Sequence, residues 1–193
     1  ERYFPNVEGK GKTGIQIVSS GPDSKWTSVK DGYLKMIINA KEKVYIQTPY
    51  FIPDDSILEA LKMAGLSGVD VKVMIPDKPD HPFVYWASLS YIGELIEAGV
   101  KFYTYQDGFM HSKVIIMDDM VSSVGTANLD IRSFKLNFEV NAFIYDEKVN
   151  SEITKHILKD LERCVEITSK GYEKRSIVVK FKESVSRLLS PIL

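Results

Sequence analysis

Four polar residues in one stretch of the chain could together bind and cleave a phosphodiester. His111 and Lys113 precede an apolar run at 114–117, and Thr126 and Asn128 follow a second such run. A lysine supplies positive charge to a phosphate, while hydroxyl and carboxamide groups donate to its non-bridging oxygens. A histidine can attack phosphorus or transfer a proton near neutral pH. These residue types predict phosphate chemistry if the fold brings them together.

The two runs predict a β-hairpin. Residues 114–117 are apolar and mostly β-branched, a strand-like pattern resumes at 120–124, and the two aspartates between them favour a tight turn. Alternation places His111 and Lys113 on one face. If Met117 pairs with Met120, the hairpin also brings Thr126 and Asn128 to that face, because directly opposed residues share a face.

Asp118 and Glu139 differ in their expected positions. Asp118 lies seven positions after His111, an odd number, so it should point to the opposite face and serve as a strand-end or turn residue. Glu139 lies in a third predicted strand, 138–145, in which every second residue is apolar and points to the face opposite Glu139. A carboxylate at Glu139 could hold one nitrogen of the His111 imidazole and set its tautomer.

The spacing of these residues resembles a known signature. The run H-x-K-x4-D at 111–118, followed by G-T-x-N at 125–128, resembles the phospholipase D superfamily. Glu139 also stands where that superfamily places an acid that orients the histidine. The sequences of segments 48–55, 99–113 and 125–146 resemble those of bacterial cardiolipin synthases, which belong to this superfamily. That family carries two such motifs in one polypeptide, whereas this chain carries one.

The resemblance implies a site and a reaction. The implied catalytic set is His111, Lys113, Asp118, Asn128 and Glu139, with Lys113, Thr126 and Asn128 holding the phosphate, and it needs no metal or other cofactor. The implied reaction is phosphatidyl transfer through a phosphohistidine, in which two phosphatidylglycerols give cardiolipin and glycerol. In two-motif relatives the C-terminal histidine more often acts as acid and base, which favours that role for His111.

Length and composition limit the alternatives. We expect residues 1–13 to be a linker and residues 14–193 to be one phospholipase D-like catalytic half-domain, the C-terminal half of a longer protein. The net charge of −1 gives no broad basic field and disfavours nucleic acid as a partner. A single-motif nuclease that works as a homodimer, and a half-domain that is idle on its own, remain alternatives.

The expected partners are phosphatidylglycerol and anionic membrane lipids, together with the missing N-terminal half or a second copy of the chain. The sequence has no apolar run approaching the roughly 20 residues needed to span a bilayer. We therefore expect the anchor of a bacterial membrane enzyme to lie elsewhere, with this piece soluble or peripheral.

The remaining pattern predicts an α/β/α sandwich with a mixed, partly parallel central sheet, since helices and strands alternate with short links. We expect strands at 14–20, 44–48, 69–75 and 100–106, and helices at 24–39, from Asp54 or Asp55 to about Gly65, at 83–98 and at 147–167. The loop at 48–55 is expected either beside the site or as a buried turn, and His81 as an exposed turn residue. The basic tail at about 170–193 is expected to be a helix that either packs on the sheet or rests on anionic lipid, and the first of these is favoured.

Overall fold

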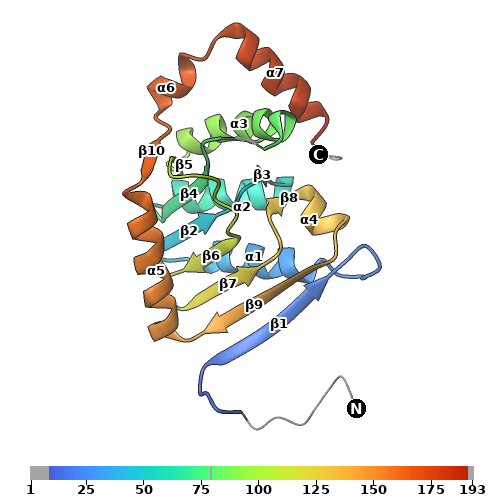
Figure 1. Cartoon of the computed structure of the whole chain (residues 1–193), viewed down its shortest axis with the longest axis vertical. Coiled ribbons are helices and arrows are strands. Elements are labelled where there is room, and N and C mark those ends of the chain that lie inside the picture. Colours follow the sequence, from blue (N-terminus) through green and yellow to red (C-terminus); the bar gives the residue numbers. More distant parts are fainter. Residues whose placement is uncertain (1–8, 79, 191–193) are drawn as a thin grey trace.

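The centre of the fold is a mixed sheet of eight strands (Figure 1). The computed structural model describes residues 9–78 and 80–190. In spatial order the strands are β1 (Gly14–Ser20), β9 (Glu139–Tyr145), β7 (Val121–Gly125), β6 (Val114–Met117), β2 (Lys43–Gln47), β4 (Asp70–Pro76), β5 (Lys101–Tyr105) and β10 (Cys164–Glu166). Strands β2, β4 and β5 pair in parallel, and the other neighbours pair antiparallel. The predicted mixed, partly parallel sheet is confirmed.

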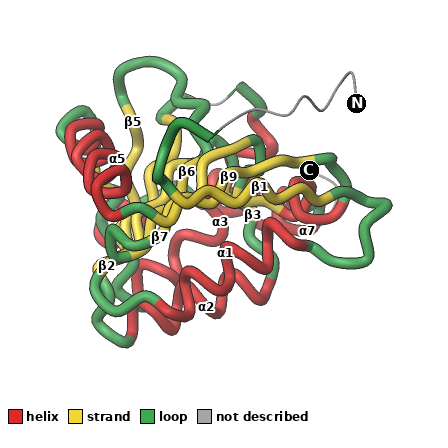
Figure 2. Tube along the Cα trace, turned by 90° about the horizontal axis from the view of Figure 1, so that it is seen from below, coloured by secondary structure: helices red, strands yellow, loops and turns green. Residues whose placement is uncertain are grey.

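Helices cover both faces of this sheet (Figure 2). One face carries α1 (Ser28–Asn39), α2 (Asp55–Leu66) and α3 (Pro82–Glu97), and the other carries α5 (Glu147–Leu161). Short parallel strands β3 (Phe51–Ile52) and β8 (Leu129–Asp130) pair beside the main sheet, and α4 (Ile131–Lys135) follows β8 directly. The helices α6 (Ser169–Glu173) and α7 (Ile177–Leu188) pack on the outside of α3. The α/β/α sandwich is therefore confirmed.

The side chains of β6 show why this part of the sequence is continuously apolar. Ile115 and Met117 pack under α1, whereas Ile116 packs with Ile157 of α5. A strand covered on both faces has no side on which polar residues are favoured.

The two helices that flank the site elements begin at side-chain caps: Asp54 accepts the N–H of Ile57, and Asp146 that of Val149, each at 3.1 Å.

Several predicted elements differ in the structure. The helix predicted from residue 24 begins at Ser28, and the strand predicted from residue 111 begins at Val114. The helix predicted to run to residue 167 ends at Leu161, because Cys164–Glu166 forms β10 and pairs with β5 at the sheet edge. The basic tail is two helices, α6 and α7. Within the loop at 48–55, the pair Phe51–Ile52 is a short strand. Most of the predicted linker, residues 1–8, and the end of the predicted tail helix, residues 191–193, lie outside the described residues.

Candidate active site

The predicted hairpin forms, but its register differs by one residue from the prediction. Met117 pairs with Val121, not with Met120, and the ladder continues to Val114 opposite Val124. Asp118 and Asp119 both have positive φ, 51° and 55°, and the turn closes with the N–H of Met120 on the carbonyl of Met117 at 2.9 Å. Consequently Lys113 lies opposite Gly125, whose N–H donates to the Lys113 carbonyl at 3.2 Å.

Asp118 has a structural role at the turn of the hairpin. Its carboxylate accepts the backbone N–H groups of Lys41, Glu42 and Lys43 at 2.8 to 2.9 Å. These bonds fix the loop before β2 to the hairpin turn, at the end of β6 away from His111. The structure therefore gives Asp118 the turn role predicted from strand parity, and its carboxylate has no hydrogen bond to His111 among the described residues.

His111 and Lys113 lie just before β6. The His111 ring is exposed and stacks on Phe109 with 5.6 Å between ring centroids. The ammonium of Lys113 donates to the His111 carbonyl at 2.8 Å. Between them, Ser112 donates to Gln47 at 3.1 Å. Among the described residues, no side chain forms a hydrogen bond with the His111 ring.

Glu139 begins β9 and is 7% exposed. Its carboxylate accepts a hydrogen bond from the Thr126 hydroxyl and another from the Asn137 amide at 3.2 Å. The predicted hydrogen bond between Glu139 and His111 is not formed in this structure, and the carboxylate oxygens bind these two neighbours instead. Glu139 and Thr126 do meet, so the structure joins two of the predicted residues directly.

Asn128 is placed by two short elements. Immediately after it, β8 pairs with β3, so the loop at 48–55 lies against the site segment while Phe51 and Ile52 are buried. Both expectations for that loop thus hold together. The Asn128 N–H donates to Ser133 Oγ at 3.1 Å, and the Ser133 N–H donates to Asp130 at 2.6 Å. The Oδ1 atom of Asn128 is buried and has no hydrogen-bond partner among the described residues.

The buried side chain of Asn141 holds the backbone of residues 126–128 in place. On β9 the face that carries the polar side chains is the buried face: Asn141 is 1% exposed, whereas Val140 is 45% exposed. The Asn141 amide donates to Tyr33 Oη at 2.8 Å and to Ser123 Oγ at 2.9 Å, and its oxygen accepts the N–H of Ala127 at 3.2 Å. A buried carboxamide with all three contacts filled fixes the backbone that carries Thr126 and Asn128.

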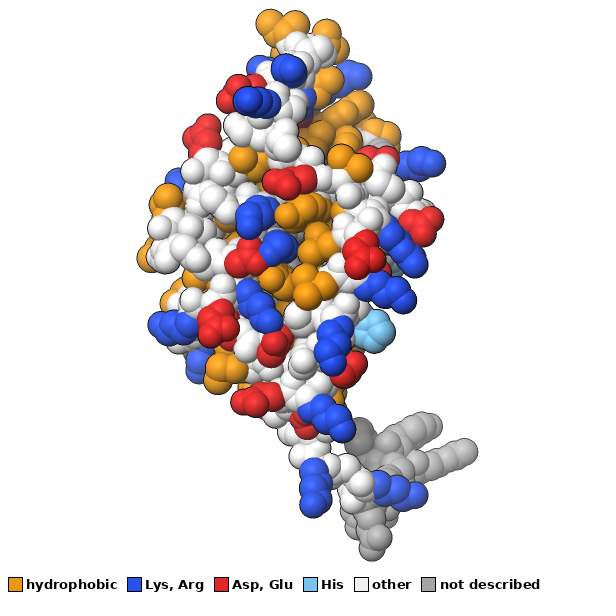
Figure 3. All heavy atoms as spheres, turned by 90° about the vertical axis from the view of Figure 1, so that its left-hand side faces the viewer, with side chains coloured by type: hydrophobic (Ala, Val, Ile, Leu, Met, Phe, Trp, Pro, Cys, Tyr) orange, Lys and Arg blue, Asp and Glu red, His pale blue; other side chains and the backbone are white. Residues whose placement is uncertain are grey.

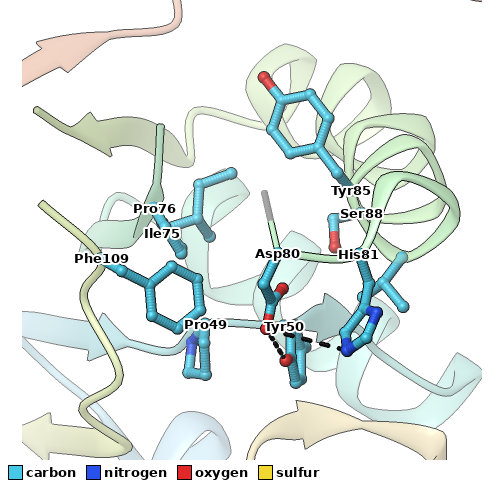
Figure 4. A pocket seen from close by; sticks show the side chains of 10 residues that line it. Pro49, Tyr50, Ile75, Pro76, Asp80, His81, Tyr85, Ser88 and Phe109 are labelled. Atoms are coloured by element: carbon cyan, nitrogen blue, oxygen red, sulfur yellow. Dashed lines mark hydrogen bonds and ion pairs between the residues drawn. The ribbon is translucent and has the colours of Figure 1, made fainter. Parts of the chain in front are cut away.

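A cavity of about 250 Å³ opens beside Asn128. It is lined by Tyr50, His81, Val84, Asn128, Asp130, Arg132 and Asn137. An adjoining smaller pocket is closed on one side by Phe109, the ring on which His111 stacks (Figure 4). The candidate site thus runs from His111 past Phe109 to the cavity.

Of the seven lining residues only Asn128 was predicted to belong to the site, and three of the others could contact a ligand through polar groups. Tyr50 donates to Asp80 at 2.5 Å, and His81 lies beside the same carboxylate at 4.0 Å (Figure 4). His81 was predicted to be an exposed turn residue; its side chain is exposed, but it lines the cavity, because the start of α3 faces β8 and α4 there. Arg132 follows the Asn128 segment by only four positions, and that proximity could have identified it.

Carboxylates around Lys113 offset its burial only in part, and its pKa is lowered. Burial lowers the pKa of Lys113, and the carboxylates of Glu139, Asp130 and Asp80 oppose that effect. Burial raises the pKa of Asp130, while hydrogen bonds from Ser133 and Asn128 act in the opposite direction.

The site therefore gathers cations at Lys113 and Arg132, hydrogen-bond donors at Tyr50 and Asn128, and an exposed imidazole. That set can hold a phosphodiester and move a proton. Among the described residues, no three His, Cys, Asp or Glu side chains are grouped closely enough to hold a metal ion.

Solved structures share this fold. The phospholipase D family member Nuc from Salmonella typhimurium superposes with a TM-score of 0.68 at 23% identity, covering 82% of this chain and all of that one. Phosphatidylserine synthase from Haemophilus influenzae gives a TM-score of 0.75 at 16% identity and covers 97% of this chain and 49% of that one. The fold is therefore that of phospholipase D-like proteins.

Sequence comparison defines the family more closely. The family model described as cardiolipin synthase, PLD-like domain, matches residues 33–161, and the chain belongs to this family. Cardiolipin synthase from Listeria welshimeri is 58% identical over the whole of this chain, and cardiolipin synthase 2 from Staphylococcus epidermidis is also 58% identical. The chain spans about 40% of the length of these relatives.

Proposed function

We propose that this chain supplies one of the two H-x-K motifs of a phosphatidyltransferase that makes cardiolipin from two molecules of phosphatidylglycerol. The observation that carries the proposal is the 58% identity to cardiolipin synthases over the whole chain. Because the chain spans only 40% of those relatives, the second motif would come from the rest of a longer protein or from a second copy.

The reaction proceeds in two displacements at phosphorus. A histidine nitrogen attacks the phosphorus of the donor, the bond from phosphorus to the headgroup glycerol oxygen breaks, and the other histidine protonates the departing glycerol. A hydroxyl of the acceptor phosphatidylglycerol then attacks the phosphohistidine and the P–N bond breaks. The second histidine takes the proton of that hydroxyl. We assign His111 to this acid–base role.

The other site residues would bind and orient the phosphate. Lys113 supplies charge, and the Asn128 carboxamide borders the cavity next to Arg132. Hydrogen-bond donors that are already positioned around the phosphate oxygens stabilise the negative charge that develops there, and they lower the activation barrier without a metal. Glu139, held by Thr126 and Asn137, maintains the segment that presents these donors.

The test is a transfer assay on the longer protein that carries this chain, with phosphatidylglycerol vesicles as substrate. His111→Ala should lower cardiolipin formation by at least about a thousandfold, since residues that act as a unit lose most of the rate when one is removed. Stability should change little, because the ring is exposed and stacks only on Phe109. His156→Ala on the exposed side of α5 is the matched control.

Two results would contradict the proposal. Transfer by His111→Ala at the wild-type rate would remove His111 from the chemistry. Cleavage of DNA by the wild-type protein, without cardiolipin formation, would replace the lipid assignment with a nuclease. The net charge of −1 argues against that second result, because nonspecific nucleic-acid binding depends on neutralising phosphates with Lys and Arg.

A further inference from the structure

The helices α6 and α7 form a separate layer on the outside of α3 (Figure 1). Both lie beyond residues 33–161, the part matched by the family model. The side chains of α7 indicate a role for this layer besides packing on α3.

The face of α7 that packs on α3 is polar. Glu183 and Ser186 are 4% and 1% exposed. Arg175, just before the helix, forms an ion pair with Glu183 at 3.2 Å. Arg187 donates to the Ser90 carbonyl of α3 at 3.0 Å. The contacts of Arg175 and Arg187 fix this polar face, whereas Ser186 Oγ and Glu183 Oε1 are buried without a hydrogen-bond partner among the described residues. A buried polar face is the reverse of the usual amphipathic packing.

The opposite face of α7 is apolar and exposed. Its members are Ile177, Val178, Phe181, Val185, Leu188 and the adjoining Leu189. At 100° per residue, these positions fall within an arc of about 120°. Ile177, Phe181 and Leu188 are 83%, 69% and 81% exposed. The sequence has enough apolar residues to bury this helix, yet the structure turns them away from the protein.

Basic residues border this apolar arc. The exposed lysines of the layer are Lys170, Lys174, Lys180 and Lys182, while Arg187 forms an ion pair with Glu94 of α3 at 2.9 Å. The two acidic residues of the layer are Glu173 and Glu183, and Glu183 is buried against Arg175. Figure 3 shows hydrophobic side chains together with Lys and Arg at the end of the molecule where Figure 1 places α6 and α7. The exposed surface of this layer therefore combines an apolar stripe with a strong excess of positive charge.

We propose that the apolar face of α7 (Ile177, Phe181, Val185 and Leu188) lies on the surface of an anionic lipid bilayer. A helix with one apolar face and basic flanks binds in the interfacial plane, with its apolar side chains among the acyl chains and its cations at the headgroups. A second copy of the chain is a poorer occupant, because a two-fold interface would bring the same lysines together. This inference goes beyond the proposed function and does not depend on turnover.

The experiment is co-flotation of the 193-residue chain with vesicles of equal parts phosphatidylglycerol and phosphatidylcholine, against vesicles of phosphatidylcholine alone. The wild-type chain should float with the first and remain behind with the second. Phe181→Ser with Leu188→Ser should lower the bound fraction about tenfold. The matched control is Met63→Ser with Leu66→Ser, which removes two side chains of similar exposure on α2.

A second pair of variants tests the charge. Lys174→Glu with Lys180→Glu should lower binding to the anionic vesicles about tenfold and reduce its dependence on salt. Lys148→Glu with Lys159→Glu, which changes two exposed lysines of α5, should bind like the wild type. Circular dichroism and the urea midpoint of each variant show that it is folded.

Three outcomes would overturn the inference: a wild-type chain that does not float with the anionic vesicles, α7 variants that bind like their controls, or a dimer that the apolar α7 variant converts to a monomer. The last result would assign the face to a second copy. His111→Ala should float like the wild type. A loss of cardiolipin formation with flotation intact, or the reverse, therefore separates this inference from the proposed function.

Discussion

Thr126 links two strands of the site through one hydroxyl, which donates to the Glu139 carboxylate and accepts the N–H of Val140 at 2.9 Å. Glu139 therefore serves, in this structure, to hold the segment that leads to Asn128. The carboxylate that was expected to orient His111 instead stabilises the backbone that carries the other phosphate-binding residues.

The first prediction follows from this link. Thr126→Val removes the donor to Glu139 and leaves that buried carboxylate with Asn137 alone. An unsatisfied buried acceptor costs about 1–3 kcal/mol, so the free energy of unfolding should fall by about that amount. Urea denaturation of the chain measures the loss. Thr126→Ser keeps the hydroxyl and should recover most of the stability; equal losses in the two variants would show that the methyl group matters instead.

Local pattern predicted most of the fold. Strands β1, β4, β6 and β9 lie close to where the alternation or the apolar runs placed them. Burial explains the apolar runs of β4 and β6, whereas Ile15 and Ile17 of β1 are exposed and the polar side chains of β9 are buried. The helix end at Leu161 was missed, since β10 is a strand only by pairing with β5 across the sheet edge. A long-range pairing of three residues leaves no local signal.

The site was predicted in part, for similar reasons. Residue types and spacing led us to propose His111, Lys113, Asn128 and Glu139, and these roles stay predictions; the Glu139 carboxylate acts to raise the pKa of Lys113. The hairpin register failed by one residue because the positive φ values at the turn are set partly by distant amide groups. His81 was missed because the cavity that it lines is assembled from separate segments of the chain.

The second prediction concerns Asp118. Asp118→Ala removes the acceptor for three backbone N–H groups. It also puts alanine, which has no polar side chain to stabilise a left-handed conformation, at φ 51°. The free energy of unfolding should fall by about 2–4 kcal/mol, the sum of unsatisfied donors and backbone strain. Asp118→Asn tolerates the left-handed conformation and keeps one acceptor oxygen, so it should lose less than half as much. Urea denaturation of both variants measures the difference, and equal losses would contradict this role.

The third prediction concerns pH. Burial would raise the pKa of Asp70, but hydrogen bonds from Lys72, Tyr45 and Lys101 hold it at about 2, below the ordinary value of 3.8. A carboxylate with a depressed pKa stabilises the fold fully above its unfolded pKa, and that contribution is lost as the pH falls from about 4 to about 2.

Asp70→Asn should therefore lower the free energy of unfolding at pH 7 by about 1 kcal/mol, a value reduced for the partial exposure of this cluster. The difference between the variant and the wild type should shrink as the pH falls below 4. Urea denaturation at pH 7, 5 and 3 tests this. Asp23→Asn, which changes an exposed loop carboxylate, is the control. A deficit that stays constant with pH would mean that geometry, and not charge, stabilises the cluster.

The last prediction concerns this chain by itself. The proposed reaction requires two proton-transferring or nucleophilic histidines, and the chain has His81, His111 and His156. His156 lies on the exposed side of α5. His81 lines the cavity but stands beside Asp80, outside any H-x-K sequence.

As a monomer, the chain should therefore form cardiolipin at least about a thousand times more slowly than the longer protein with both motifs. The measurement is a transfer assay with phosphatidylglycerol vesicles, run beside a determination of mass in solution. His81→Ala in the same chain is the control for unassisted activity at the cavity. If the chain dimerises with two His111 residues facing one donor, part of the rate should return. Rapid cardiolipin formation by a proven monomer that also requires His81 would show that the second histidine of the reaction lies within this chain.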